Sequence, residues 1–389
     1  MTPDPGPPRA FSKRNDDIEV LRAVAVLFVV VAHLRTLFFW RDSWLDRIGG
    51  LPFWGGVDLF FCISGFVITN TLLRHSPGSA RFADIGVPFW IRRIFRIWPA
   101  ALLWLALPLL CAKLFNTSGA FGSVHENLPG AAAAAGQVAN LYQVICNPDP
   151  HARWPCGRLD VYWSLSLEEQ FYLVFPWLCF FLRRPVLCGV LVALVLAQIF
   201  IPRPLANPLW YVRTDAIALG VLIALCSARP LIAEHIPRWV RRGRVASLLS
   251  ILLMATIALL GARPFALSTG SLALVSAGLV LIASANADVI LPWRPLRKVL
   301  VWVGSRSFAI YLAHMPCYWA TREIFLRFPH HGGYSDGHTI PFALVAAALL
   351  TLAAEATYRI VETPLRNKGR RLAERYDWSP SSQPGYCKA

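Results

Sequence analysis

The feature that most constrains this chain of 389 residues is the recurrence of long apolar segments along almost its whole length. Most of these segments approach the ~20 residues that a helix needs to cross a bilayer. They lie at residues 17–39, 55–73, 97–115, 161–182, 185–201, 210–227, 245–261, 267–284, 299–320 and 340–361. With 56% hydrophobic and only 15% charged residues, the composition is not that of an ordinary soluble domain. We therefore expect an all-α, polytopic membrane protein of about ten transmembrane helices.

The distribution of charge predicts how these helices are inserted. If the N-terminus is cytoplasmic and ten spans follow, 24 Lys and Arg residues fall in cytoplasmic segments and eight in external ones. The positive-inside rule requires a bias of this kind. The net charge of +16 therefore reports topology, and we do not expect nucleic acid as a partner. The expected location is the inner (cytoplasmic) membrane, with residues 1–16 as a disordered cytoplasmic lead, 17–362 as the membrane domain and 363–389 as a cytoplasmic tail.

Two ionisable residues, Arg22 and His33, lie within the first apolar segment. Eleven residues correspond to three helical turns plus roughly 20°, so both side chains share one face and are separated by ~16 Å of rise. An ionisable residue inside a membrane span is costly and indicates a functional site by default. The alternative is a snorkelling Arg beside an interfacial His.

Further polar residues recur at a similar depth in the outer halves of five expected spans. These residues are His33, Asp58, Glu168, Glu169, Arg213, Asp215 and His314. Isolated charges in a membrane are costly, so these side chains should face one another or water. The sequence therefore predicts that the helices surround a polar, hydrated cavity that opens outward.

A second polar group gathers at the expected inner surface. It comprises Arg22, Arg92, Arg93, Arg96, Arg359 and Glu362. Arg93 and Arg96 are three residues apart, so they share a helix face and could bind phosphate groups through bidentate contacts. Simple anchoring by the positive-inside rule is the alternative. An anionic cytosolic ligand that reaches toward a buried His would account for both polar groups.

The residue types suggest a chemistry for the outer group. His33 could act as a general base toward a hydroxyl or accept an acyl group itself. A carboxylate such as that of Glu168 could orient the imidazole or stabilise its protonated form. Nine Cys residues are scattered without a spacing suited to zinc, so no metal is expected. Cys146 and Cys156 share the long external loop 116–160, where a disulfide is one possibility and two free thiols the other.

Seven segments, which follow one another along the chain, are motifs of a known protein family. They are IEVLRAVAVLFVVVAH, GVDLFFCISGFVI, FWIRRIFRIWPA, YWSLSLEEQFYLVFP, RTDAIALG, FAIYLAHMP and VETP, and together they cover roughly residues 16–366. The chain thereby resembles the acyltransferase-3 family of membrane acyltransferases, which O-acetylate bacterial surface polysaccharides and some small molecules. The resemblance implies acyl-CoA, often acetyl-CoA, as donor, and a carbohydrate or small-molecule hydroxyl as acceptor.

The resemblance also implies roles for individual residues. It makes His33 the catalytic residue and Arg22 its motif partner, assigns Arg93 and Arg96 to the CoA phosphates, and matches Glu168 to the acid of the WSLxxE motif. Many relatives carry a soluble hydrolase-like domain after the membrane region, whereas a short tail without a GDS motif follows here. We therefore expect the membrane domain either to complete the transfer alone or to pass the acyl group to a separate partner protein.

Two other functions could use such a chain. A transporter or flippase for a lipid-linked or anionic solute would also need buried His and acidic residues, although we detect no internal repeat of the kind many transporters show. A non-catalytic scaffold would not need so many buried charges. The predicted activity is therefore O-acyl transfer, with transport as the alternative.

Overall fold

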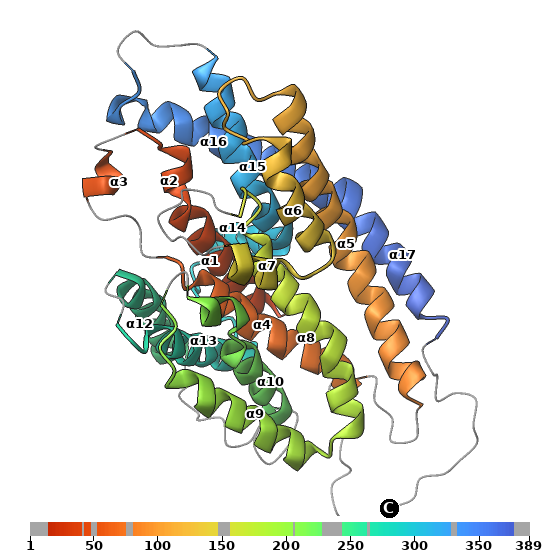
Figure 1. Cartoon of the computed structure of the whole chain (residues 1–389). Coiled ribbons are helices and arrows are strands. Elements are labelled where there is room, and N and C mark those ends of the chain that lie inside the picture. Colours follow the sequence, from red (N-terminus) through yellow and green to blue (C-terminus); the bar gives the residue numbers. More distant parts are fainter. Residues whose placement is uncertain are drawn as a thin grey trace, which may run out of the picture.

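The computed structural model describes residues 15–40, 43–47, 53–74, 81–146, 156–204, 207–227, 243–262, 265–327 and 333–376, and in these ranges all regular structure is helical (Figure 1). The prediction of an all-α chain is confirmed. The predicted lead falls almost wholly outside the described residues, as do the basic segment 228–242 and residues 377–389. Asn15, the first described residue, caps the first helix by accepting a hydrogen bond from the Ile18 N–H at 3.1 Å.

The described helices follow one another in this order: α1 (Asp16–Ala32), α2 (Leu34–Leu37), α3 (Trp44–Arg47), α4 (Gly56–Arg74), α5 (Phe82–Leu114), α6 (Val124–Ala135), α7 (Ala139–Cys146), α8 (Tyr162–Phe181), α9 (Arg184–Ile199), the 3₁₀ turn η1 (Pro208–Val212), α10 (Asp215–Ser227), α12 (Gly243–Ala262), α13 (Ser268–Ser284), α14 (Arg294–Ser305), α15 (Ser307–Leu326), the 3₁₀ turn η2 (Asp336–His338), α16 (Thr339–Ala356), the π-helical turn η3 (Thr357–Glu362) and α17 (Thr363–Ala373). In Figure 1, α17 runs alongside α5 on one side of the bundle, and α9, α10, α12 and α13 form a group on the other.

Six helical stretches among the described residues are long and apolar enough to cross a membrane. They are Asp16–Leu37, Gly56–Leu73, Phe82–Leu114, Pro208–Ser227, Gly243–Ala262 and Asp336–Ala373. The shorter apolar helices α9 and α13, together with the 20-residue helices α8 and α15, fall on the remaining expected spans. Large apolar side chains point away from the protein, such as Leu259 with 67% of its surface exposed and Leu352 with 69%. The chain is therefore a polytopic membrane protein, as predicted.

Three boundaries differ from the sequence-based expectation. Helix α5 begins at Phe82, well before the expected span 97–115, and continues unbroken for 33 residues because α17 packs along it, with Gly369 against Phe95. The expected span 299–320 is interrupted at Arg306, whose N–H bonds to the Val303 carbonyl and ends α14. Beyond Glu362 the chain remains helical through α17 to Ala373.

The helices at the centre of the bundle approach one another closely. A Cβ atom on Gly220 of α10 would lie 2.0 Å from the Cys62 carbonyl oxygen of α4, and one on Gly65 of α4 would lie 2.1 Å from the Ile217 carbonyl oxygen. Only glycine allows the two backbones to meet at these points. This contact fixes the position of α4, which carries Asp58 and Ser64.

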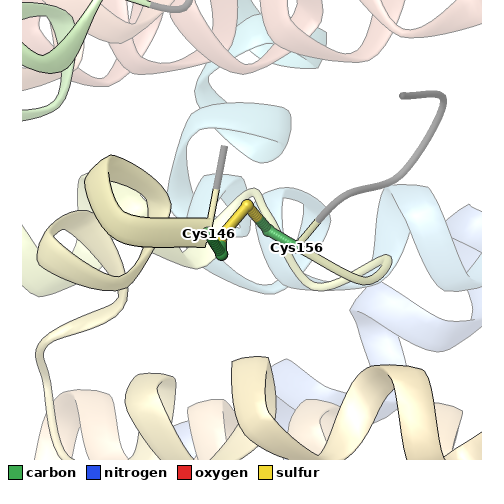
Figure 2. The surroundings of a disulfide bond; sticks show 2 residues. All are labelled: Cys146 and Cys156. Atoms are coloured by element: carbon green, nitrogen blue, oxygen red, sulfur yellow. A yellow bond between two sulfur atoms is a disulfide. The ribbon is translucent and has the colours of Figure 1, made fainter. Parts of the chain in front are cut away.

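The segment between α5 and α8 forms a small structure of its own on one end of the bundle. It contains α6 and α7, and a disulfide joins Cys146, at the end of α7, to Cys156, with their Cα atoms 5.4 Å apart (Figure 2). Of the two possibilities that the sequence leaves open, the structure shows the bonded one. We call this end of the bundle the disulfide side.

Candidate active site

A cavity lies between α1, α4, α5, α8 and α15. Its polar lining consists of Arg22, Ser64, Arg93, Arg96, Ser164, Glu168, Tyr172, Ser307 and Tyr311. The structure therefore brings together four of the residues singled out from the sequence, namely Arg22, Arg93, Arg96 and Glu168. We call this space the arginine cavity.

The guanidinium groups of the arginine cavity are only partly compensated by acidic groups. Arg22 Nη1 binds Glu19 Oε1 at 3.2 Å. Arg93 is 8% exposed, and its guanidinium carbon lies 5.3 Å from the centroid of the Tyr172 ring. Among the described residues, neither Arg93 nor Arg96 has a carboxylate within ion-pair distance. Because unpaired buried charges are costly, the cavity is suited to an anionic ligand.

Glu168 belongs to the arginine cavity rather than to the histidines. Its Oε1 accepts a hydrogen bond from Ser64 Oγ at 3.1 Å, and its Oε2 accepts one from the Tyr172 hydroxyl at 2.6 Å. The sequence-based expectation placed this carboxylate beside His33, but the contacts of His33 in the described chain are with other groups. The physical reason is the depth of Glu168 in the bundle. Glu168 lies six residues, or ~9 Å, along α8 from Tyr162, the first residue of that helix.

His33 pairs instead with the second histidine singled out from the sequence. The two ring centroids, His33 at the end of α1 and His314 in α15, lie 5.1 Å apart with an interplanar angle of 60°. His33 Nδ1 lies 2.8 Å from the Val29 carbonyl oxygen, and His314 Nδ1 lies 2.6 Å from the Tyr311 carbonyl oxygen. A carbonyl can only accept, so both Nδ1 atoms carry hydrogen in the neutral rings and both Nε2 atoms carry a lone pair.

Tyr311 connects the histidine pair to the arginine cavity. Its ring lines the cavity, and its centroid lies 5.7 Å from that of His314. Its hydroxyl contacts Ser164 Oγ at 2.6 Å and donates to the Val161 carbonyl oxygen at 2.8 Å. Tyr311, with Ser164 bound to its hydroxyl, therefore lies between the arginine cavity and the histidine pair.

The remaining residues that were expected to line a cavity form buried ion pairs outside the arginine cavity. Arg213 binds Asp58 through its Nε and Nη2 atoms at 2.9 and 3.1 Å, with both side chains fully buried. Asp215 is buried against Arg203 in a second ion pair. These carboxylates do not line the arginine cavity, which corrects the expectation of one shared cavity. The reason is that each bidentate pair satisfies its own charge.

Glu169 lies on another side of α8 from the arginine cavity. Its Oε2 accepts a hydrogen bond from Trp98 Nε1 at 3.1 Å. Ser64, Tyr172 and Tyr311 could not be singled out from the sequence in the same way, because single hydroxyls in apolar helices give no distinctive signal. Only Tyr172 could have been found, since its spacing of four from Glu168 places both on one helix face. Within the described ranges, no three His, Cys, Asp or Glu side chains gather closely enough to hold a metal ion.

Comparison with known sequences connects this geometry to a family. The sequence model of the acyltransferase-3 family, which describes an acyltransferase domain, matches residues 15–358. The chain belongs to the acyltransferase-3 family. The match includes α1 with Arg22 and His33, α5 with its arginines, α8 with Glu168 and α15 with His314.

Among known relatives, the chain is 29% identical over 378 residues to "Peptidoglycan O-acetyltransferase OatA" of Listeria monocytogenes, covering 90% of this chain and 56% of that protein. It is 28% identical over 375 residues to "O-acetyltransferase OatA" of Staphylococcus aureus, covering 90% of this chain and 57% of that protein. The chain thus spans a little over half the length of these relatives. No solved structure matches it.

Proposed function

We propose that this chain is a membrane O-acyltransferase that moves an acyl group, acetyl in the first instance, from cytosolic acyl-CoA to a hydroxyl of a cell-surface carbohydrate or related acceptor. The names of the relatives support O-acetyl transfer. The observation that carries the proposal is that a cavity rich in arginine lies next to a pair of histidines, with Tyr311 between them.

The disulfide supports an orientation for the bundle. Disulfides persist in oxidising compartments and are rare in the cytosol, so the disulfide side is assigned to the external face. Arg96 lies 18 residues, or ~27 Å, along α5 from Leu114, where α5 ends on the disulfide side. The arginine cavity then opens toward the cytosol. This orientation agrees with the charge bias of the sequence and with two cytoplasmic termini.

The arginine cavity has the charge that a CoA donor requires. The phosphates of CoA are anionic, and the guanidinium groups of Arg22, Arg93 and Arg96 are planar donors suited to bidentate phosphate contacts. A donor held there by its phosphates would direct its thioester toward Ser164 and Tyr311. Glu168, held by Ser64 and Tyr172, would limit how deeply an anionic group can enter the cavity.

His33 supplies the base for the transfer in this proposal. Its Nε2 lone pair takes the proton of the acceptor hydroxyl while the hydroxyl oxygen attacks the thioester carbonyl carbon. The tetrahedral intermediate collapses with cleavage of the carbon–sulfur bond, and the CoA sulfur leaves with the proton that His33 received. The products are an ester and CoA thiol. In the other order that the chemistry allows, His33 Nε2 accepts the acyl group first and then passes it to the hydroxyl.

The position of His33 suggests which side presents the acceptor. His33 ends α1, ~16 Å along the helix from Arg22, toward the disulfide side. An acceptor on the external face could therefore reach the imidazole while the donor remains on the cytosolic side. A separate acyl-accepting protein could take the place of the carbohydrate at this point.

The test uses the purified full chain in liposomes with acetyl-CoA and a soluble glycan acceptor. Mass spectrometry measures free CoA and acetylated glycan for the wild-type protein, His33→Ala and a control, Arg370→Gln, whose exposed side chain lies beside Glu374 on α17. The proposal expects equal amounts of both products from the wild type and the control, and none above background from His33→Ala. Movement of a solute without release of CoA would support the transporter instead.

A further inference from the structure

Helix α14 is too short to cross a bilayer, although the sequence predicted a span over residues 299–320. Its 12 residues extend ~18 Å, whereas the hydrocarbon core of a bilayer is ~30 Å thick. The N–H of Arg306 bonds to the Val303 carbonyl oxygen at 3.0 Å, which ends α14 before α15 begins at Ser307. A helix of this length lies in water, inside the protein or at the membrane surface, and the surroundings of α14 distinguish these three positions.

One face of α14 is held against the start of α1. Arg297 Nη1 binds Asp17 Oδ1 at 2.8 Å. A Cβ atom on Gly304 would lie 1.9 Å from the Glu19 carbonyl oxygen, so the two backbones meet at that point. The side chain of Leu300 is buried in the same cluster as α1. Because α1 runs from these residues toward the disulfide side, α14 lies at the opposite end of the bundle, where the first membrane-crossing stretch begins.

The C-terminal end of α14 is anchored as well. Arg306 binds Glu355 through its Nε and Nη2 atoms at 2.5 and 3.2 Å, and its guanidinium carbon lies 4.4 Å from the centroid of the Tyr358 ring. The next residue, Ser307, lines the arginine cavity. Both ends of α14 are thus fixed to other helices, and the faces that the helix turns outward are defined by these contacts.

The outward side of α14 is divided into an apolar and a basic face. Leu296, Val299 and Trp302 are all exposed, Val299 by 57%, and at 100° per residue they lie in one sector ~120° wide. Arg294 and Lys298 lie in the adjacent sector and are also exposed. The described part of the chain provides neither of these two cations with an ion-pair partner. We call these five residues the α14 surface.

This division of charge and apolar area excludes two of the three positions. The described chain covers neither outward face, so α14 is not inside the protein. In water the apolar face would remain hydrated, which is unfavourable. A helix with a basic face beside an apolar face that includes Trp is stable in the plane of the membrane surface, where the apolar side chains enter the acyl-chain boundary. Its basic side chains then lie among the headgroups and attract those that are anionic.

We propose that α14 lies in the headgroup region of the membrane and that the α14 surface binds an anionic phospholipid. Arg294 and Lys298 contact the lipid phosphate, while Leu296, Val299 and Trp302 contact its acyl chains. The ligand is recognised by the combination of a negative headgroup with an apolar tail, which a soluble anion lacks. This binding goes beyond the proposed acyl transfer and does not depend on it.

The first experiment measures lipid preference. The purified full chain is mixed in detergent with equal amounts of phosphatidylglycerol and phosphatidylcholine, and native mass spectrometry counts the lipids that each protein retains. A basic residue near an anionic lipid surface contributes about 5-fold in affinity. Arg294→Gln combined with Lys298→Gln should therefore lower the preference for phosphatidylglycerol about 25-fold, and Arg294→Lys combined with Lys298→Arg should keep it.

The matched control removes two charges from exposed side chains of α17, by Arg370→Gln combined with Arg371→Gln. This control should retain the wild-type preference. An equal loss in both double variants would show that net surface charge attracts the lipid, and would overturn the α14 surface as a site. A wild-type protein that retains the two lipids equally would also overturn it.

The second experiment tests the position of α14 directly. A photoreactive benzophenone side chain replaces Val299 in the full chain, which is then reconstituted in liposomes that contain phosphatidylglycerol. The same side chain in place of Glu374, which is 60% exposed near the end of α17, serves as the comparison. Illumination should yield lipid adducts at residue 299 in large excess over residue 374. Adducts at residue 299 with a second copy of the chain, or the absence of lipid adducts there, would overturn the proposal.

Discussion

The imidazole rings of His33 and His314 lie 5.1 Å apart, and each ring has its Nδ1 atom bound to a carbonyl oxygen of its own helix. This arrangement leaves both Nε2 atoms with lone pairs. His314 is fully buried, and its Nε2 has no hydrogen-bond partner in the described chain. The His33 ring therefore lies beside a buried imidazole whose Nε2 lone pair is unpaired in the described chain.

The first prediction concerns His314. His314→Gln should lower kcat for acetyl transfer about 10-fold or more while KM for acetyl-CoA stays the same, because His314 contacts the His33 ring and does not line the arginine cavity. Steady-state kinetics on the purified protein measure both constants. A raised KM with normal kcat would show that His314 contributes to donor binding instead.

The second prediction concerns the arginine cavity. Arg96→Gln should raise KM for acetyl-CoA about 10–100-fold, since a charge-assisted hydrogen bond contributes ~1.5–3 kcal/mol. Arg370→Gln on the exposed face of α17 is the matched control and should leave KM unchanged. Equal effects of the two substitutions would point to surface electrostatics rather than to a specific site.

The third prediction separates structural from functional charges. Asp58→Ala leaves Arg213 buried without its partner, which should cost ~3–5 kcal/mol of folding free energy and markedly lower the thermal unfolding temperature in detergent. The double variant Asp58→Leu with Arg213→Met should recover much of that stability. If the single variant unfolds normally yet loses acetyl transfer, Asp58 belongs to the active site.

Much of this fold could be predicted from sequence because apolar length is a direct consequence of bilayer thickness. Each of the ten expected spans falls on a described helix. The break at Arg306 could not be predicted, because it depends on a tertiary contact: a Cβ atom on Gly304 would lie 1.9 Å from the Glu19 carbonyl oxygen. The continuation into α17 likewise depends on packing against α5.

The candidate site was only partly predictable for a similar reason. The spacing of Arg93 and Arg96 defines one helix face, and the structure places both in one cavity with Arg22. Pairing across helices has no such local signal. Several acidic residues fall near the expected depth of His33 or beyond, and nothing in the sequence shows that Glu168 is bound by Ser64 and Tyr172 in the arginine cavity.

The fourth prediction tests orientation and the disulfide together. Cys146 and Cys156 should resist maleimide labelling in intact cells and become labelled after treatment with a membrane-impermeant reductant. Replacing both by Ser should cost ~2–5 kcal/mol of stability and lower acetyl transfer, because the segment that begins at Cys156 leads to Val161, which accepts the Tyr311 hydroxyl. A reporter fused to the C-terminus should remain cytoplasmic. Labelling without any reductant, or an external reporter, would contradict the assigned topology.

The most direct test of the central claim is the acyl-ester content of surface glycans, measured by mass spectrometry. Cells that lack the protein are compared with cells that express wild type or His33→Ala at matched levels. We predict one defined mass increment in wild-type cells, about 42 Da for an acetyl ester. We predict that this increment is lost in both other strains. An increment that persists with His33→Ala would contradict the assignment of His33 as the catalytic residue.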